Sequence, residues 1–395
     1  MSEQTNESFH VAGWVHRLGG LIERHRSFCL RLADVESRLL HDRLEAVEIR
    51  QPIYVSGLAR AGTTLLLEVL ARHRSVATHQ YRDFPPVFLP YAWNWLLGHI
   101  ETRAAEPVER PHGDGILITP ASPEAMEEVL WMAFFAQAHD PEASAVLDRS
   151  TANPAFEAFY RAHIAKLLLA RGGTRYGAKA NYNVTRLEYI QKIFPGARFI
   201  VPVRRPETHV ASLMRQHRLF SGRLSQNPRA AAHLKRMGHF EFGPDRRPIN
   251  AGDTKAVREI RELWARGEEL RGWARYWAMI YGHLADRLDR NRELRAATLV
   301  LRFEDLCADP AAQLERLFDH VRLENAGSVI EYFSGRIRAP DDRQSSHTAA
   351  QLGVIREETE ETAAKFAYPA GLGALEVTAP LPQAASAGVP QAPLV

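Results

Sequence analysis

A glycine-rich turn carries the side chains with the clearest chemical meaning. It follows the apolar run 53–55 and consists of Gly57, Leu58, Ala59, Arg60, Ala61, Gly62, Thr63 and Thr64. The two glycines allow the backbone to fold tightly, so that successive N–H groups point into one concavity at the start of a helix. Such a turn holds a phosphate or sulfate through its amides and the positive end of the helix dipole. Arg60 adds a guanidinium, and the two threonines add hydroxyl donors.

This turn differs from the phosphate loop of a nucleoside triphosphatase, which carries G-x-x-x-x-G-K-[ST]. Thr63 stands at the lysine position, and Arg60 lies two residues before the second glycine. A triphosphatase also needs Mg²⁺ held by an aspartate at the end of a strand, whereas the late apolar strand ends in Arg302, Phe303 and Glu304. The seventeen histidines form no H-E-x-x-H or comparable ligand set, so we expect no metal site.

A second anion-binding pattern follows the apolar run 199–201. Arg204 comes at the end of this run, Pro206 starts a helix, and Ser212 lies two turns into it. Arg204 and Ser212 can face one phosphate, with a charge on one side and a hydroxyl on the other. A surface arginine before a helix is the alternative. Because ligands of open parallel sheets bind at the carboxyl ends of the strands, the two patterns together predict a ligand with two separated anionic groups.

Three segments resemble sulfotransferases that use 3′-phosphoadenosine-5′-phosphosulfate (PAPS). GLARAGTTLL (57–66) resembles their 5′-phosphosulfate loop, and R-x-P-x-x-x-x-x-S (204–212) resembles their 3′-phosphate motif. VLRFEDLCADPAAQLERLF (300–318) is similar to their late strand-plus-helix segment. The loop looks most like that of the tyrosylprotein (Golgi-type) and bacterial branches. The resemblance covers roughly 50–215 and 297–322.

The resemblance implies an enzyme that transfers a sulfuryl group from PAPS, its co-substrate, to a hydroxyl or amine without a metal. Residues 57–64, with Arg60, would hold the phosphosulfate, and Arg204 and Ser212 the 3′-phosphate. In the tyrosylprotein branch a lysine fifteen residues before a Phe-Pro pair assists the transfer, and Lys179 has this position relative to residues 194–195. A surface lysine is the alternative interpretation.

Sulfation needs a general base within hydrogen-bond reach of the acceptor. In the tyrosylprotein branch the base is a glutamate about twenty residues after the loop, and that register falls here on Tyr81. The glutamate is therefore absent. We take Asp83, with His79 beside it, as one candidate base, and His112, with Asp114, as another.

The order of the elements predicts an α/β fold with a P-loop-type, mostly parallel sheet flanked by helices. Strand-like segments at 53–55, 174–180, 199–201 and within 297–306 alternate with helical segments, which favours short right-handed crossovers. A helix should open at Ser122, with Glu127 and Glu128 either on its surface or interacting with the helix dipole. The other expected helices span 11–48, 154–170, 184–194, 254–289, 310–321 and a stretch beginning at Pro206.

The domain organisation follows from these elements. We expect an N-terminal helical segment over 1–50 and a single sulfotransferase-like domain over 51–378, with insertions at 84–120 and 222–250. The tail 379–395 has low complexity and is predicted to be disordered. The apolar stretch 84–100 is too short to span a membrane. It lines the acceptor pocket or the core in one interpretation and contacts a membrane surface in the other.

Composition excludes several classes. A net charge of +3 does not indicate a nucleic-acid binder, and two cysteines build no disulfide framework, which fits the cytoplasm. The N-terminus lacks the pattern of a secretory signal. The acceptor is left open as a small molecule, a lipid or a glycan, and the oligomeric state is also open. A divergent P-loop kinase or NTPase and a non-catalytic binding relative remain alternatives.

Overall fold

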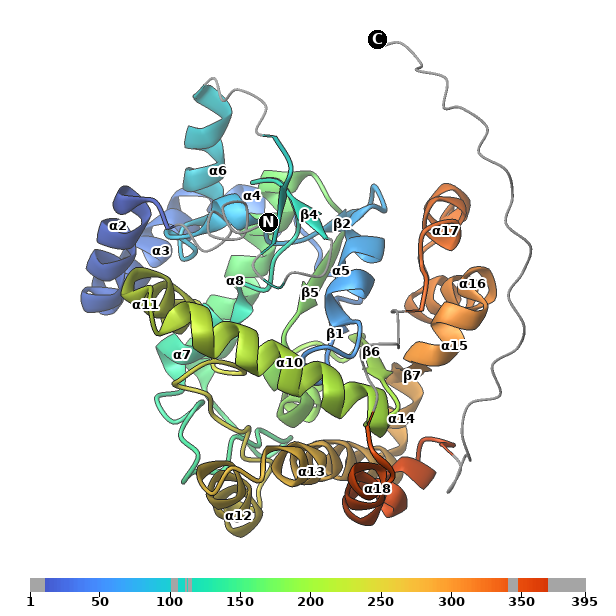
Figure 1. Ribbon diagram of the computed structural model, residues 1–395. Helices are drawn as coiled ribbons and strands as arrows, with labels where there is room; N and C mark the ends of the chain where they lie inside the picture. Colours follow the sequence, from blue (N-terminus) through green and yellow to red (C-terminus); the bar gives the residue numbers. More distant parts are fainter. Residues whose placement is uncertain (1–10, 101–105, 111, 113–115, 340–346, 369–395) are drawn as a thin grey trace, which may run out of the picture.

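Five parallel strands form the central sheet of the computed structural model, in the order β2-β5-β1-β6-β7 (Figure 1). The structure describes residues 11–100, 106–110, 112, 116–339 and 347–368. The strands are β1 Ile53–Val55, β2 Val76–Ala77, β5 Arg175–Lys179, β6 Arg198–Val203 and β7 Thr298–Arg302. A separate antiparallel hairpin consists of β3 Val108–Glu109 and β4 Leu117–Ile118. The predicted α/β fold with a mostly parallel sheet is confirmed.

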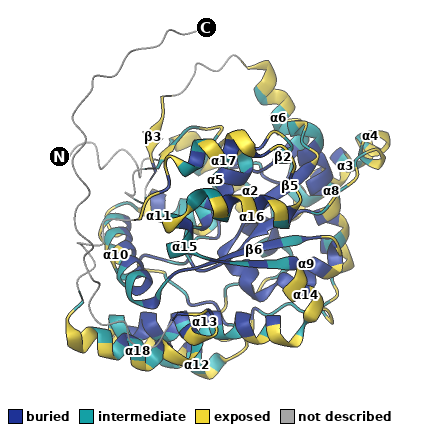
Figure 2. Cartoon of the chain, turned by 90° about the vertical axis from the view of Figure 1, so that its right-hand side faces the viewer, coloured by how far each residue is buried: buried dark blue, intermediate teal, exposed yellow. Residues whose placement is uncertain are grey.

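Helices cover both faces of the sheet, as a parallel sheet requires. One core cluster joins Tyr54 and Phe199 to residues of α8, α9 and α13. The other joins Ile53, Val55 and Ile200 to residues of α5, α16 and α17. Figure 2 shows this burial, with β6 inside the molecule and the outer faces of α12 and α16 exposed.

The bounds of the helices are α2 Gly13–Arg24, α3 Arg26–Leu39, α4 His41–Glu45, α5 Thr63–Ala71, η1 Tyr81–Asp83, α6 Pro90–His99, α7 Glu127–Phe134, α8 Pro154–Arg171, η2 Asn181–Thr185, α9 Leu187–Ile193, α10 Pro206–Leu224, α11 Pro228–Arg236, α12 Thr254–Ala265, α13 Glu269–Arg290, α14 Arg292–Ala297, α15 Phe303–Ala308, α16 Pro310–Val321, α17 Gly327–Ser334 and α18 Ala349–Ala364.

The strand register places the candidate residues at one edge of the sheet. Val55, the last residue of β1, is opposite Lys179 in β5 and Ile200 in β6. The glycine-rich turn, Lys179 and Arg204 therefore all follow the carboxyl ends of adjacent strands, where ligands of such sheets bind.

Some expected helices differ in the structure. The stretch 11–48 forms three shorter helices, α2, α3 and α4. The helix expected to open at Ser122 begins at Glu127, because residues 122–124 instead hydrogen-bond to the segment 79–81. The stretch 254–289 forms two helices, α12 and α13, which are separated by a turn at Gly267 with φ +82°. Glycine adopts this left-handed conformation at little cost, so it ends the first helix.

The prediction that Glu127 and Glu128 lie on a helix surface is wrong. Glu127 is 1 % and Glu128 4 % exposed. Burial raises the pKa of Glu127, although it accepts hydrogen bonds from the hydroxyls of Tyr160 and Tyr176. Burial alone would raise the pKa of Glu128 too, but the charges of Arg186 and His139 lower it to about 2. Both carboxylates therefore make polar contacts inside the core and do not face solvent.

No helix within the described residues is both long and apolar enough to cross a membrane. The predicted insertion 84–120 contains α6 and the β3–β4 hairpin, and the insertion 222–250 contains the end of α10 and all of α11. The predicted disordered tail 379–395 lies outside the described residues.

Candidate active site

The glycine-rich turn connects β1 to α5 through two residues in the left-handed region. Arg60 has φ +72° and Gly62 has φ +98°. Gly62 is the N-cap of α5 and supplies no side-chain hydrogen bond, so the helix amides there are not capped by a side chain. A Cβ at Gly62 would lie 2.8 Å from the Phe303 ring. The aromatic ring of Phe303 thus fixes how closely the turn approaches the end of β7.

Substituting Gly62 by alanine should destabilise the protein by about 2–4 kcal/mol, because left-handed strain and overpacking against Phe303 add. The control is Gly172→Ala at the end of α8, where φ is +68° and no atom lies within 4 Å of the added Cβ. That variant should lose only about 1 kcal/mol. Denaturant unfolding measures both free energies of unfolding. Equal losses would contradict the idea that the Phe303 ring restricts the space at residue 62.

Arg204 is fixed next to this turn. Its side chain is buried, its Nε donates to Thr208 Oγ1 at 3.1 Å, and its Nη1 donates to the carbonyl oxygen of Arg60 at 3.5 Å. The guanidinium carbon also lies 5.1 Å from the centroid of the Phe303 ring. A cation held between an aromatic face and a backbone carbonyl is preorganised for an anion.

Helix α10 joins the second motif to the first. Arg60 Nε donates to Ser212 Oγ at 3.4 Å. His209 Nε2 donates to the Ala59 carbonyl at 2.8 Å, while its Nδ1 accepts from Trp277 Nε1 at 3.2 Å. Burial lowers the pKa of His209 to about 3, and the nearby charges of Arg204 and Arg60 add to this. A neutral histidine, which the sequence analysis did not identify, therefore ties the two anion motifs together.

Lys179 is the last residue of β5. Its side chain is only 9 % exposed, so the surface-lysine alternative is wrong. Burial lowers the pKa of Lys179 and the charges of Arg110 and Arg60 lower it further, whereas Glu241 and Glu124 oppose the shift. The ammonium therefore lies among two arginines and two carboxylates.

Glu124 is a residue that the sequence analysis missed. Tyr81 N donates to the Ser122 carbonyl at 3.1 Å and Glu124 N to the His79 carbonyl at 2.9 Å. This pairing brings the Glu124 carboxylate to the Tyr81 hydroxyl, which hydrogen-bonds to it. Burial first, and then the charge of Glu124, raises the pKa of Tyr81 well above its ordinary value. A glutamate from a later loop thus reaches Tyr81, the residue in the register where the tyrosylprotein branch has its glutamate.

The insertion 222–250 brings a second carboxylate to Lys179. Glu241 lies 3.5 Å from His239 Nδ1 and accepts from Asn181 Nδ2 at 2.7 Å. Burial alone would raise the pKa of Glu241, but His239 and Lys179 lower it to about 2. Burial would lower the pKa of His239, but the hydrogen bond and the charge of Glu241 raise it. The insertion therefore contributes charged groups to the site.

Asp83 and His79 have a different environment from Lys179. Asp83 forms a buried ion pair with Arg171 at 2.6 Å and lies 3.4 Å from His79 Nδ1. Burial would raise the pKa of Asp83, but His79 and Arg171 hold it well below its ordinary range. His79 Nε2 also lies 3.2 Å from His163 Nε2. These contacts anchor the turn 80–83 to α8.

His112 lies next to α10, where its ring is 5.2 Å from that of Phe220. Asp114, which we paired with it, lies outside the described residues. In the part of the chain that the structure describes, no three histidine, cysteine, aspartate or glutamate side chains gather as a metal ion would need.

Comparisons with known proteins identify a family. Residues 52–247 match the model described as the sulfotransferase family. Sulfotransferase STF1 from Mycobacterium tuberculosis is 16 % identical, with 89 % of this chain and 86 % of that one covered and a TM-score of 0.45. STF9 from Mycobacterium avium is 14 % identical, with 82 % and 80 % covered and a TM-score of 0.45. No curated protein matches. The family assignment rests on the match over 52–247.

Proposed function

We propose that this chain, whose residues 52–247 belong to the sulfotransferase family, transfers a sulfuryl group from PAPS to a hydroxyl or amine. The observation that carries the proposal is the convergence of Arg60, Arg204 and Ser212 at one sheet edge, with Lys179 among the adjacent charges. A cofactor with a 5′-phosphosulfate and a 3′-phosphate supplies the two anionic groups that such an arrangement suits.

Lys179 and Glu124 each have a role in the proposed transfer. The acceptor oxygen or nitrogen attacks the sulfur, and the bond from sulfur to the bridging oxygen of the phosphosulfate breaks. Adenosine 3′,5′-bisphosphate leaves with the bond electrons, and the ammonium of Lys179 stabilises the charge on the departing oxygen. The acceptor proton passes to the carboxylate of Glu124, which we prefer as base because Asp83 is occupied by its ion pair with Arg171.

The acceptor is proposed only as a class. The site presents the Tyr81 hydroxyl, the carboxylates of Glu124 and Glu241, and the Arg110 guanidinium around Lys179. A small molecule, a lipid or a glycan with a free hydroxyl or amine fits such a polar surface. We propose a cytoplasmic location, where PAPS would be available.

Calorimetric titration with adenosine 3′,5′-bisphosphate, alongside ATP with Mg²⁺, tests the donor assignment. We expect the bisphosphate to bind, and Arg204→Ala to weaken its binding about 10- to 100-fold, the value of a charge-assisted hydrogen bond. Arg205→Ala is the matched control, because it removes the same charge from the next residue. Binding of ATP with Mg²⁺ alone would favour a kinase, and binding of neither would favour a non-catalytic module.

A further inference from the structure

Helices α2 and α3 expose an apolar stripe to solvent. Trp14, Leu18, Leu21, Phe28, Leu32, Val35 and Leu39 follow one another at spacings of three or four residues, with His25 at the break between the helices. Side chains at this spacing lie on one face of a helix. Phe28 is 52 % exposed, Leu21 48 % and Leu39 81 %. An exposed stripe of this length indicates a surface that contacts something apolar.

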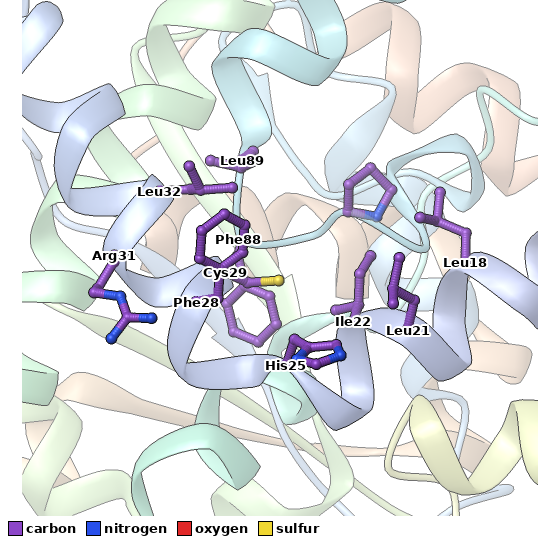
Figure 3. A pocket seen from close by; sticks show the side chains of 11 residues that line it. Leu18, Leu21, Ile22, His25, Phe28, Cys29, Arg31, Leu32, Phe88 and Leu89 are labelled. Atoms are coloured by element: carbon purple, nitrogen blue, oxygen red, sulfur yellow. The ribbon is translucent and has the colours of Figure 1, made fainter.

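The stripe contains a cavity at the angle between the two helices. The cavity has a volume of about 550 Å³. Figure 3 shows Leu18, Leu21 and Ile22 of α2 on one side and Phe28 and Leu32 of α3 on the other, with Phe88 and Leu89 on the α3 side. Its size and its apolar lining suit a hydrocarbon chain.

Four arginines follow the stripe along one flank. Arg17, Arg24, Arg31 and Arg38 are spaced seven residues apart, and all are exposed. None of the four makes an ion pair with a side chain in the described ranges. Glu23 does not neutralise the row, because it pairs with Arg236 of α11 at 2.9 Å. The stripe is therefore bordered by positive charge.

A second copy of the chain is a poor occupant. The opposite flank of the stripe consists of Val15, Ile22 and Cys29, which pack against the core of the same chain. Pairing two copies would therefore bring no acidic row against the arginines, and an antiparallel pair would bring the two arginine rows together. Like charges in such positions are unfavourable.

An anionic bilayer satisfies both features, because it buries apolar side chains and attracts arginines at its surface. Helix α6 contacts α3, since Ala92 N donates to Glu36 of α3 at 2.6 Å, and Figure 1 places α6 next to α3 and α4. Trp95 of α6 is 59 % exposed and Ile100, which follows the helix, is 50 % exposed, so the interpretation of 84–100 as core is wrong for these two residues. We propose that α2 and α3 dock this protein on an anionic lipid bilayer, with the cavity accepting an acyl chain.

Co-sedimentation of the full chain with vesicles tests the proposal without any assay of sulfuryl transfer. We expect binding to vesicles of phosphatidylglycerol and phosphatidylcholine, and little binding to phosphatidylcholine alone. Arg24→Gln/Arg31→Gln should weaken binding about 25-fold, since each arginine near an anionic surface contributes about a factor of five. Leu21→Ser/Phe28→Ser should weaken it to a similar extent, because the apolar contact is lost.

The control variant is Arg290→Gln/Arg292→Gln, which removes two exposed arginines from α13 and α14. It should bind anionic vesicles like the parent protein. If both arginine variants lost vesicle binding equally, the proposal would be overturned, because binding would then depend on the net charge of the protein and not on the arginines of α2 and α3. Absence of binding to anionic vesicles would overturn it as well. So would a dimer in solution that Leu21→Ser/Phe28→Ser converts to monomer, since the stripe would then be a subunit interface.

Discussion

Lys179→Met should lower kcat for sulfuryl transfer about a thousandfold, because removing a preorganised group that stabilises charge in the transition state costs about 10²–10³ or more. Methionine retains the apolar stem of the side chain that is buried next to β1, so the fold should survive. Binding of adenosine 3′,5′-bisphosphate should weaken by no more than about tenfold, because Arg60, Arg204 and Ser212 remain. The measurement is single-turnover transfer from radiolabelled PAPS to an acceptor found by screening.

The pH dependence gives a second test of the same role. Burial lowers the pKa of Lys179, with Arg110 and Arg60 adding to the shift and Glu241 and Glu124 opposing it. A lowered pKa means that the ammonium is lost at a lower pH than in a free lysine. The rate should therefore fall on the alkaline side, and Lys179→Met should lack that decline. Lys255→Met, at a lysine whose side chain is 88 % exposed, is the control. An alkaline decline that persists in Lys179→Met would refute the role.

The meeting of the two anion motifs was predictable from the sequence. Each motif follows an apolar run that reads as a buried strand, and the carboxyl ends of parallel strands share one edge of the sheet. The position of Lys179 followed from the same argument. No pattern in the sequence indicated that His209 joins the two motifs. His209 acts through a backbone carbonyl and a tryptophan 68 residues away, and such contacts have no spacing that a pattern could reveal.

Glu124 could not be predicted for a related reason. Ser122, Pro123 and Glu124 have the composition of a helix start, and local propensity alone favours that interpretation. Hydrogen bonds from residues 79–81 to residues 122–124 prevail instead and place the carboxylate next to Tyr81. Asp83 shows the reverse case. It occupies a plausible position in the chain, but Arg171 from α8 neutralises it inside the protein. Long-range pairing decides which carboxylate is available.

Glu124→Gln should lower kcat about 10²–10⁴-fold, because general-base catalysis contributes about that much. Glutamine has the same size and can still contact the Tyr81 hydroxyl. Binding of adenosine 3′,5′-bisphosphate should not change, because the anion motifs at 57–64 and 204–212 are intact. The measurement pairs single-turnover transfer with calorimetric titration of the bisphosphate, so that loss of chemistry is separated from loss of the donor site.

Asp83→Asn is the variant that distinguishes the two candidate bases. Removing one partner of a buried ion pair costs about 3–5 kcal/mol, so this variant should lower the free energy of unfolding while the folded fraction keeps its kcat. Glu124→Gln should lower kcat and leave the free energy of unfolding nearly unchanged. Glu124 is half-buried and has no such ion pair among the described residues. If Asp83→Asn instead abolishes transfer in a stably folded protein and Glu124→Gln leaves it intact, the base is Asp83. The loop pairing of 79–81 with 122–124 would then serve only to close the site.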